Sequence, residues 1–271
     1  MFQPFEIVEL PPKGYDEKRP EIIYPEFNHL TYYSRTASRE TGVNVLLPPG
    51  FSENKRYPVL YVLHGYFGNE YSISSPEMSL SVIYNNLLAK GMAKEMIMVL
   101  PYIFCDKNMP VCTEMNLTNS MAYDNFVNDL CLDLIPFIRK SLPVLTDRHY
   151  MAITGFSMGG REALYIGFTH PELFSYVGAV CPAPGLLKIQ DSPMHPGQIS
   201  EGLLCKKEGL ALNVLISSSM SDDVVGTAPD SYRQVLSKNG IEFQTHIMKN
   251  EGHDESSVKP HFYNYLRLLF N

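Results

Sequence analysis

Apolar positions along the chain fall into short continuous runs, and these runs predict the buried strands of a sheet. Such runs are typical of strands that are covered on both faces. They occupy 57–63, 96–100, 151–154, 176–180 and 213–218. Segments 30–37, 42–47 and 242–248 alternate between apolar and polar residues, as a strand with one face in water does. The first two predict an antiparallel hairpin that turns at 38–41.

Longer segments between these runs carry apolar residues at helical spacing. They predict helices at 77–90, 123–138, 160–169, 229–238 and 258–270. Pro136 lies inside the second of them, so a kink or break is expected there. Strands that alternate with helices predict an α/β fold, with a mostly parallel central sheet, right-handed crossovers and helices on both faces.

Three segments follow neither pattern. Residues 1–25 carry five prolines and predict an extended arm or linker, which leaves 26–271 as a single domain. Residues 102–121 predict a long irregular loop after a strand, either a wall of the binding site or a surface insertion. Residues 181–210 are irregular and rich in proline and glycine, and we expect them to form part of a cap.

Composition narrows the class of protein. The chain has 271 residues, of which 45% are hydrophobic and 19% charged, as expected for one globular domain with a large core. A formal charge of −7 argues against a nucleic-acid surface. No apolar run reaches the length of a membrane span, and the first residues lack the features of a signal peptide. We therefore expect a cytoplasmic protein or a module trimmed from a secreted one.

The five cysteines predict reduced, mostly buried thiols. Their number is odd and none stands in C-x-x-C spacing, which argues against a disulfide framework or a structural zinc site. Cys105 and Cys112 could pair across a loop, and the sequence leaves that open. No cofactor or metal is predicted.

The strand at 151–154 runs into Gly155-Phe156-Ser157-Met158-Gly159, which fits G-x-S-x-G, and helical sequence follows. This strand–turn–helix context is what a nucleophile elbow requires. A Cβ atom at either glycine would collide with the neighbouring strand or helix, and the serine is forced into strained backbone angles. The pattern predicts Ser157 as a nucleophile, with an ordinary glycine-rich turn as the alternative.

A serine hydroxyl needs a base within hydrogen-bond reach and an acid that orients the base. His253 follows the 242–248 strand and is the predicted base. Asp222 follows the 213–218 strand and is the predicted acid, with Asp223 as its competitor. Ends of successive parallel strands lie on one edge of a sheet, so these residues should converge on the serine.

The other polar candidates have structural interpretations. His64 precedes a turn and is expected to stabilise its loop by hydrogen bonds, and His246 lies within a strand. The histidines that lack a suitable place are His29, His149, His170, His195 and His261. Asp254 is expected to be a solvated or loop-capping carboxylate.

Backbone amides are predicted to bind the oxyanion of an acyl-transfer reaction. One is the amide of Met158, the residue after the nucleophile. The other is the amide of Tyr66, in the glycine-bearing loop His64-Gly65-Tyr66 after a central strand, where α/β-hydrolases place their second donor.

Several motifs, in this order and spacing, resemble carbohydrate esterase family 1, the esterase D-like group that contains feruloyl and acetylxylan esterases. They are 57–65, 123–130, 134–138, 146–148, 155–160 and 252–254. The resemblance runs from about residue 40 to the C-terminus. It implies an α/β-hydrolase fold, a triad at Ser157, Asp222 and His253, oxyanion donors at Met158 and Tyr66, and catalysis without a metal.

The resemblance also implies a substrate class: acyl groups of plant cell-wall polysaccharide, often ferulate on the arabinose of xylan. The expected partner is therefore a small ester or an acylated oligosaccharide. A general short-chain carboxylesterase and an acyltransferase of the same fold are the alternatives, and a non-catalytic binding module belongs to a different class. The chain has no tryptophan and a long 102–121 segment, and both bear on the acyl pocket.

Overall fold

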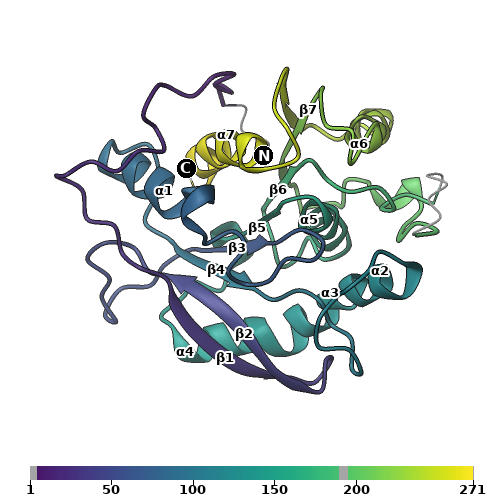
Figure 1. Cartoon of the computed structure of the whole chain (residues 1–271), viewed down its shortest axis with the longest axis horizontal. Helices are drawn as coiled ribbons and strands as arrows, with labels where there is room; N and C mark the ends of the chain where they lie inside the picture. Colours follow the sequence, from purple (N-terminus) through teal and green to yellow (C-terminus); the bar gives the residue numbers. More distant parts are fainter. Residues whose placement is uncertain (1–4, 189–194, 271) are drawn as a thin grey trace.

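The computed structural model describes residues 5–188 and 195–270, and its strands form one twisted sheet (Figure 1). The sheet has eight strands in the order β1-β2-β4-β3-β5-β6-β7-β8. Their bounds are β1 Asn28–Ser34, β2 Arg39–Leu46, β3 Val59–Leu63, β4 Ile97–Pro101, β5 Met151–Gly155, β6 Tyr176–Val180, β7 Asn213–Ser219 and β8 Gln244–Met248. β2 pairs antiparallel with β1 and β4, and the other pairings are parallel. The predicted α/β fold with its N-terminal antiparallel hairpin is confirmed.

Helices cover both faces of the sheet (Figure 1). They are α1 Leu80–Ala89, α2 Leu117–Asp124, α3 Phe126–Asp129, α4 Ile135–Ser141, α5 Met158–Thr169, α6 Ala228–Lys238 and α7 Glu255–Leu268. The buried residues of α1 and α7 belong to one hydrophobic cluster, and those of the other helices belong to a second cluster. The sheet therefore separates two cores.

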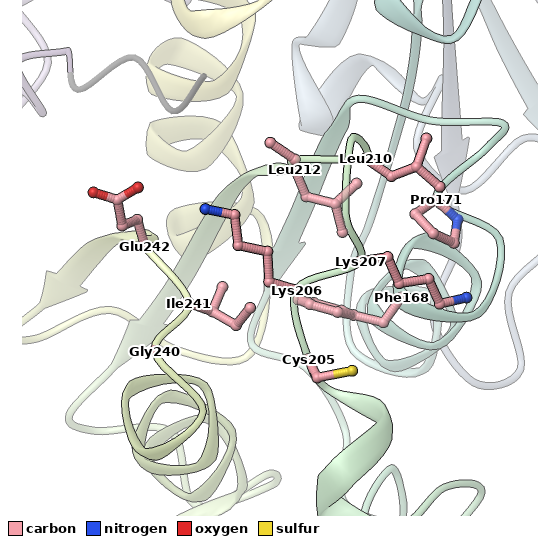
Figure 2. A pocket seen from close by; sticks show the side chains of 11 residues that line it. Phe168, Pro171, Cys205, Lys206, Lys207, Leu210, Leu212, Gly240, Ile241 and Glu242 are labelled. Atoms are coloured by element: carbon pink, nitrogen blue, oxygen red, sulfur yellow. The ribbon is translucent and has the colours of Figure 1, made fainter.

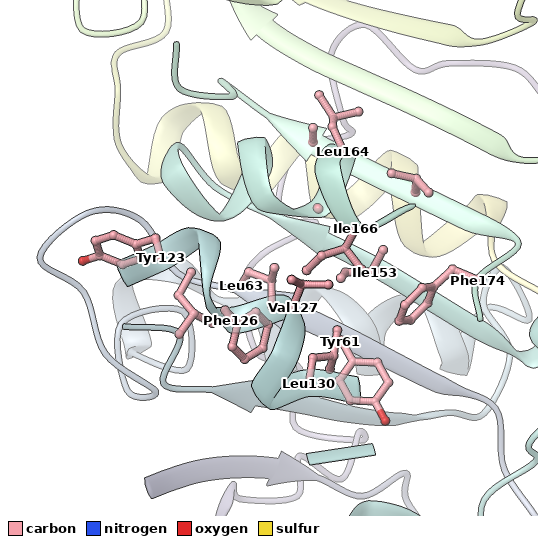
Figure 3. Close-up of a cluster of buried hydrophobic side chains, with 14 of the residues drawn as sticks. Tyr61, Leu63, Tyr123, Phe126, Val127, Leu130, Ile153, Leu164, Ile166 and Phe174 are labelled. Carbon is pink, nitrogen blue, oxygen red and sulfur yellow. The ribbon is translucent and has the colours of Figure 1, made fainter. Parts of the chain in front are cut away.

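Alternation along the central strands divides their side chains between the two cores. In β3, Val59, Tyr61 and Leu63 join the cluster under α2–α6, whereas Leu60 and Val62 join the cluster under α1 and α7. Figure 3 shows part of the first cluster, where side chains of β3 and β5 meet those of α2, α3 and α5. Because both faces are buried, these strands read as continuous apolar runs in the sequence.

The segment predicted as one kinked helix is divided into several. After α2 and α3 comes a π-helical turn, Leu130–Leu134, and α4 follows with Pro136 in its first turn. Proline has no N–H to offer the carbonyl of Leu132, four residues earlier. That carbonyl instead accepts a hydrogen bond from the Arg35 guanidinium, next to the β1–β2 turn. The missing donor at Pro136 thus helps to tie this helical segment to the hairpin.

The arm before β1 lies against the molecule. The Asn264 side chain in α7 accepts from the Val8 N–H at 2.8 Å and donates to the Val8 carbonyl at 2.9 Å. The Tyr15 ring packs edge-on against Tyr263, also in α7, with ring centroids 5.4 Å apart.

Among the described residues no helix is long and apolar enough to span a membrane.

Candidate active site

The turn between β5 and α5 is as crowded as its glycines suggest. Ser157 has φ +56° and ψ −116°, a strained backbone for a residue with a side chain. A Cβ atom at Gly155 would lie 2.4 Å from the carbonyl oxygen of Gly159, and one at Gly159 would lie 2.4 Å from the carbonyl oxygen of Leu63. The Ser157 N–H is held by the Val180 carbonyl at 3.0 Å. Neighbouring strands therefore fix the serine at the carboxyl edge of the sheet.

Two further side chains converge on this serine from loops at the same edge. His253 Nε2 lies 2.9 Å from Ser157 Oγ, and His253 Nδ1 lies 2.7 Å from Asp222 Oδ2. Asp222 is 5% exposed, whereas the competing Asp223 is exposed and faces solvent. The structure thus brings together the three predicted residues in the order serine–imidazole–carboxylate, an arrangement in which the carboxylate orients the ring and the ring can take the serine proton.

Electrostatics at Asp222 favour its charged form. Burial opposes ionisation, but hydrogen bonds from His253 and from the Cys181 thiol outweigh it, so the pKa of Asp222 is held below its usual value. Burial and the Asp222 carboxylate raise the pKa of Cys181 to about 12, which keeps the thiol protonated as a donor. The Cys181 sulfur, an Asp222 oxygen and a His253 nitrogen lie within 4.8 Å of one another, a spacing that could also hold a metal ion. Hydrogen bonds among them account for this proximity.

The loop that carries His253 is anchored on both sides. The Ser257 hydroxyl donates to the Gly252 carbonyl at 2.6 Å, and the Gly252 N–H donates to the Ser256 hydroxyl at 3.0 Å. Asp254 was predicted to be solvated or to cap its loop, and it caps α7 instead by accepting the Ser256 N–H at 2.9 Å. These bonds orient the imidazole before any substrate arrives.

The loop after β3 lies against the serine. A Cβ atom at Gly65 would be 3.4 Å from that of Ser157, so the two turns touch. Met158 is the first residue of α5, and the N–H of such a residue has no acceptor within its helix. Tyr66 and Met158 both line the pocket at Ser157. Their amides are the predicted oxyanion donors.

His64 has the structural role predicted for it. Its Nδ1 atom lies 2.7 Å from the Gly65 carbonyl, and its Nε2 atom accepts the Ile103 N–H at 3.0 Å. Burial lowers its pKa to about 4, so the ring is neutral. It joins the loop after β3 to the loop after β4.

A pocket of about 180 Å³ opens beside Ser157. Its walls come from the loops after β3, β4, β6 and β7 and from α2 and α5. The lining residues are Tyr66, Met115, Ser120, Ser157, Met158, Arg161, Ala183, Pro184, His195, Val224 and Val225. Most of these side chains are apolar, and polar groups contribute at Ser120, Arg161 and His195. Met115 lies in the predicted 102–121 loop. Ser120 lies in α2, which begins at Leu117, so the prediction of an irregular loop up to residue 121 was wrong at its end.

Behind this pocket lies a buried ion network that the sequence did not reveal. Arg161, 1% exposed, donates to Asp124 at 2.6 Å and to Glu162 at 2.9 Å. His195 Nε2 lies 2.5 Å from the other Asp124 oxygen, and the Gln198 amide donates to both carboxylates. Burial raises the pKa of Glu162 to about 8, against the attraction of Arg161. The network fastens 195–198 to α2 and α5.

The chain has a second pocket at the opposite edge of the sheet, where α5 ends and where β7 and β8 begin (Figure 2). Phe168, Leu212 and Ile241 give it apolar walls, and Lys206, Lys207 and Glu242 add charge. Its described lining contains neither a serine nor a histidine. The five cysteines, Cys105 and Cys112 included, are free thiols. The serine–histidine pair therefore marks the first pocket as the site for acyl chemistry.

Comparison with known proteins identifies the family. The model of the Esterase family matches residues 34–268. The chain belongs to this esterase family. Among solved structures, the CE1 ferulic acid esterase AmCE1/Fae1A of Anaeromyces mucronatus, in complex with ferulic acid, is 37% identical, with a TM-score of 0.92 and 98% of each chain covered. The predicted membership of carbohydrate esterase family 1 is confirmed, and the protein is a serine carboxylic-ester hydrolase.

Curated relatives extend the comparison. An endo-1,4-β-xylanase/feruloyl esterase of Xylanibacter ruminicola is 31% identical over 186 residues, which are 63% of this chain and 24% of the relative. Endo-1,4-β-xylanase Y of Acetivibrio thermocellus is 28% identical over 134 residues, 46% of this chain and 11% of the relative. This esterase thus spans about a quarter or less of the length of these relatives.

Proposed function

We propose that this esterase hydrolyses feruloyl esters of plant cell-wall xylan through an acyl-enzyme. The carrying observation is the chain of hydrogen bonds from Ser157 Oγ to His253 Nε2 at 2.9 Å and from His253 Nδ1 to Asp222 at 2.7 Å, beside a largely apolar pocket. Similarity to a ferulic acid esterase, 37% over 98% of both chains, supports the acyl group. Similarity to a xylanase/feruloyl esterase supports the polysaccharide.

In the proposed mechanism, His253 takes the proton of Ser157 as the hydroxyl oxygen attacks the ester carbonyl. Asp222, kept ionised by its hydrogen bonds, holds the ring and stabilises the imidazolium that forms. The amides of Met158 and Tyr66 bind the oxyanion, where loss of one donor typically costs about 3–4 kcal/mol of barrier. The imidazolium then protonates the sugar oxygen as its bond to the acyl carbon breaks, and the sugar leaves with a free hydroxyl. Water, deprotonated by His253, releases the acid and restores the serine.

Size supports an aromatic acyl group over acetate. The pocket of about 180 Å³ is enclosed by apolar side chains such as Met115, Pro184 and Val225, which suit a flat ring. Ser120, Arg161 and His195 supply polar groups within the same lining, which suits an acyl group with ring oxygens. An acetyl group would leave most of this surface in contact with water.

The test compares hydrolysis of methyl ferulate, p-nitrophenyl acetate and acetylated xylan by the wild type and by Ser157→Ala. We expect the highest kcat/KM on methyl ferulate, and a loss of about 10⁴-fold or more in the variant. The thermal midpoint of the variant should stay close to wild type. Retained turnover in Ser157→Ala contradicts the site, and a preference for p-nitrophenyl acetate with no action on ferulate favours a general carboxylesterase. Ester formation in the presence of an added alcohol indicates an acyltransferase.

A further inference from the structure

Phe67 has an unusual backbone for its side chain. Its φ is +62°, in the left-handed region, where residues with a Cβ atom are disfavoured and bulky ones are outliers. The other non-glycine residues with positive φ in the described part of the chain are Ser38, Ser79, Ser157, Cys181 and Phe270. Four of these are small, and Phe270 packs onto the core beside Tyr176. Phe67, by contrast, is 51% exposed.

The loop does not need the phenylalanine ring to keep its shape. The Phe67 N–H donates to the Tyr123 hydroxyl at 3.1 Å, and the Gly68 N–H donates to the Gly65 carbonyl at 3.1 Å. Both are backbone bonds that glycine or asparagine at position 67 would make equally well. Since the ring neither fills the core nor closes the turn, the strain of this position points to a role for the ring at the surface.

The ring stands next to the proposed acyl site. It packs edge-on against the Tyr66 ring with centroids 5.0 Å apart, and Tyr66 lines the pocket at Ser157. Phe67 itself is not among the lining residues, and its contact with Tyr66 places its ring beside the pocket. Met115 and Val224, which do line the pocket, are 51% and 62% exposed. The exposed border of the pocket therefore carries apolar side chains, and the half-exposed Phe67 ring adds a flat face next to Tyr66.

A large ester cannot enter this pocket whole. Its volume of about 180 Å³ is below the ~300–1,000 Å³ of sites that enclose drug-sized ligands. When the acyl group occupies it, the alcohol portion of the substrate must remain outside, beside the rim. For an ester of a polysaccharide that portion is a sugar, and the C–H groups of a sugar ring carry partial positive charge that the negative face of an aromatic ring attracts.

We propose that Phe67 forms a subsite for the sugar that carries the acyl group, with its exposed ring stacked on the C–H face of that sugar. This inference rests on the proposed function, because it assumes that the ester alcohol is a sugar. It makes Phe67 a residue that determines specificity on the leaving-group side, separate from the acyl pocket.

The experiment uses Phe67→Asn and Phe67→Tyr with two substrates that share the acyl group. Asparagine tolerates the left-handed backbone and removes the ring, whereas tyrosine keeps a flat aromatic face. On feruloyl-arabinosyl-xylobiose, we expect kcat/KM of Phe67→Asn to fall about five- to tenfold, mainly through KM, and Phe67→Tyr to stay near wild type. On methyl ferulate, which has no sugar, both variants should keep their rates. Tyr33→Asn, at an exposed aromatic of similar accessibility in the edge strand β1, is the matched control.

The possible results separate the sugar subsite from other roles of Phe67. An equal loss on both substrates places Phe67 in the support of the oxyanion loop and overturns the sugar subsite. An unchanged rate on the oligosaccharide overturns it as well, and so does failure of Phe67→Tyr to preserve the rate. Wild-type enzyme that cleaves neither ferulate substrate overturns the proposed function instead, and the two failures are thereby distinguished.

Discussion

Two aspartate–histidine pairs lie at the same pocket, and only one of them is arranged to move a proton. His253 and Asp222 are 2.7 Å apart, and His195 and Asp124 are 2.5 Å apart. The second ring nitrogen differs between the pairs. In His253 it faces the Ser157 hydroxyl, whereas in His195 it accepts the N–H of Gly197.

The carboxylates differ as well. Asp222 accepts from the protonated Cys181 thiol and from backbone amides, so the imidazole is the cationic partner available to it when the ring takes a proton. Asp124 already has the guanidinium of buried Arg161 as a partner. An Asp–His distance alone thus does not identify a base. The group that contacts the other imidazole nitrogen decides whether the pair takes part in catalysis or stabilises the pocket.

The largest difference between the pairs should appear when each carboxylate becomes an amide. We expect Asp222→Asn to lower kcat on methyl ferulate about 10³–10⁴-fold, because the amide no longer stabilises the imidazolium or fixes its tautomer. Asp124→Asn should stay within about tenfold in kcat on p-nitrophenyl acetate, whose acyl group does not reach the wall. Steady-state kinetics on both substrates measure this. Asp223→Asn is the control, and a larger loss there than in Asp222→Asn reassigns the acid.

Stability should respond in the opposite order. Arg161→Met leaves the buried Glu162 and the half-buried Asp124 without their cation, and removal of one partner from such a network typically costs about 3–5 kcal/mol of unfolding free energy. Asp222→Asn is nearly isosteric and leaves no buried charge without its partner, so it should cost less. Urea unfolding of both variants measures the difference. If Arg161→Met unfolds at the wild-type midpoint, the network does not hold the pocket wall as we describe.

A pH-dependent effect concerns two buried histidines whose rings contact no described carboxylate. Among the described contacts, His261 bonds only to the hydroxyls of Thr154 and Ser217, and His64 only to backbone groups. Burial lowers the pKa of both rings from 6.5, to about 3 for His261 and about 4 for His64. Both are neutral when folded and take up protons on unfolding below about pH 6.5. Stability is therefore fully present above that pH and is lost as the pH falls toward 4, by about 1.4 kcal/mol per unit for each ring.

The measurement for this prediction is the urea midpoint between pH 7 and pH 5. His261→Gln can still bond to both hydroxyls and does not titrate, so its midpoint should fall less steeply than that of the wild type. A wild-type midpoint that stays constant over this range contradicts the assignment of neutral buried rings.

A feature of the fold or site could be predicted when it leaves a pattern within a short segment of the sequence. The strand 176–180 was predicted with its observed bounds, because a buried strand leaves a continuous apolar run. The convergence of Ser157, Asp222 and His253 also followed from sequence, since each comes directly after a strand of a parallel sheet. Their catalytic roles remain predictions that the variants above test.

Other features depend on contacts that no short segment encodes. The helix predicted at 123–138 contains a π-helical turn, and its freed carbonyl at Leu132 finds a donor, Arg35, nearly a hundred positions away. His195 lies in an irregular stretch without periodicity, so nothing local pointed to Asp124 or to the pocket. Arg161 and Glu162 gave the one available signal: two charges directly after the glycines of the elbow, in a helix that had to pack on the sheet.

The crowding around Gly155 and Gly159 has a consequence for how this enzyme can diversify. Those two positions are closed to any larger side chain, because the obstructing atoms belong to backbone that cannot yield. The proposed rim of Phe67, Met115 and Val224 is exposed, although the positive φ at position 67 favours residues that tolerate a left-handed backbone. Mutant libraries that seek new ester preferences should therefore randomise the rim and leave Gly155 and Gly159 unchanged. Selection can then change which ester binds, while the nucleophile keeps its position.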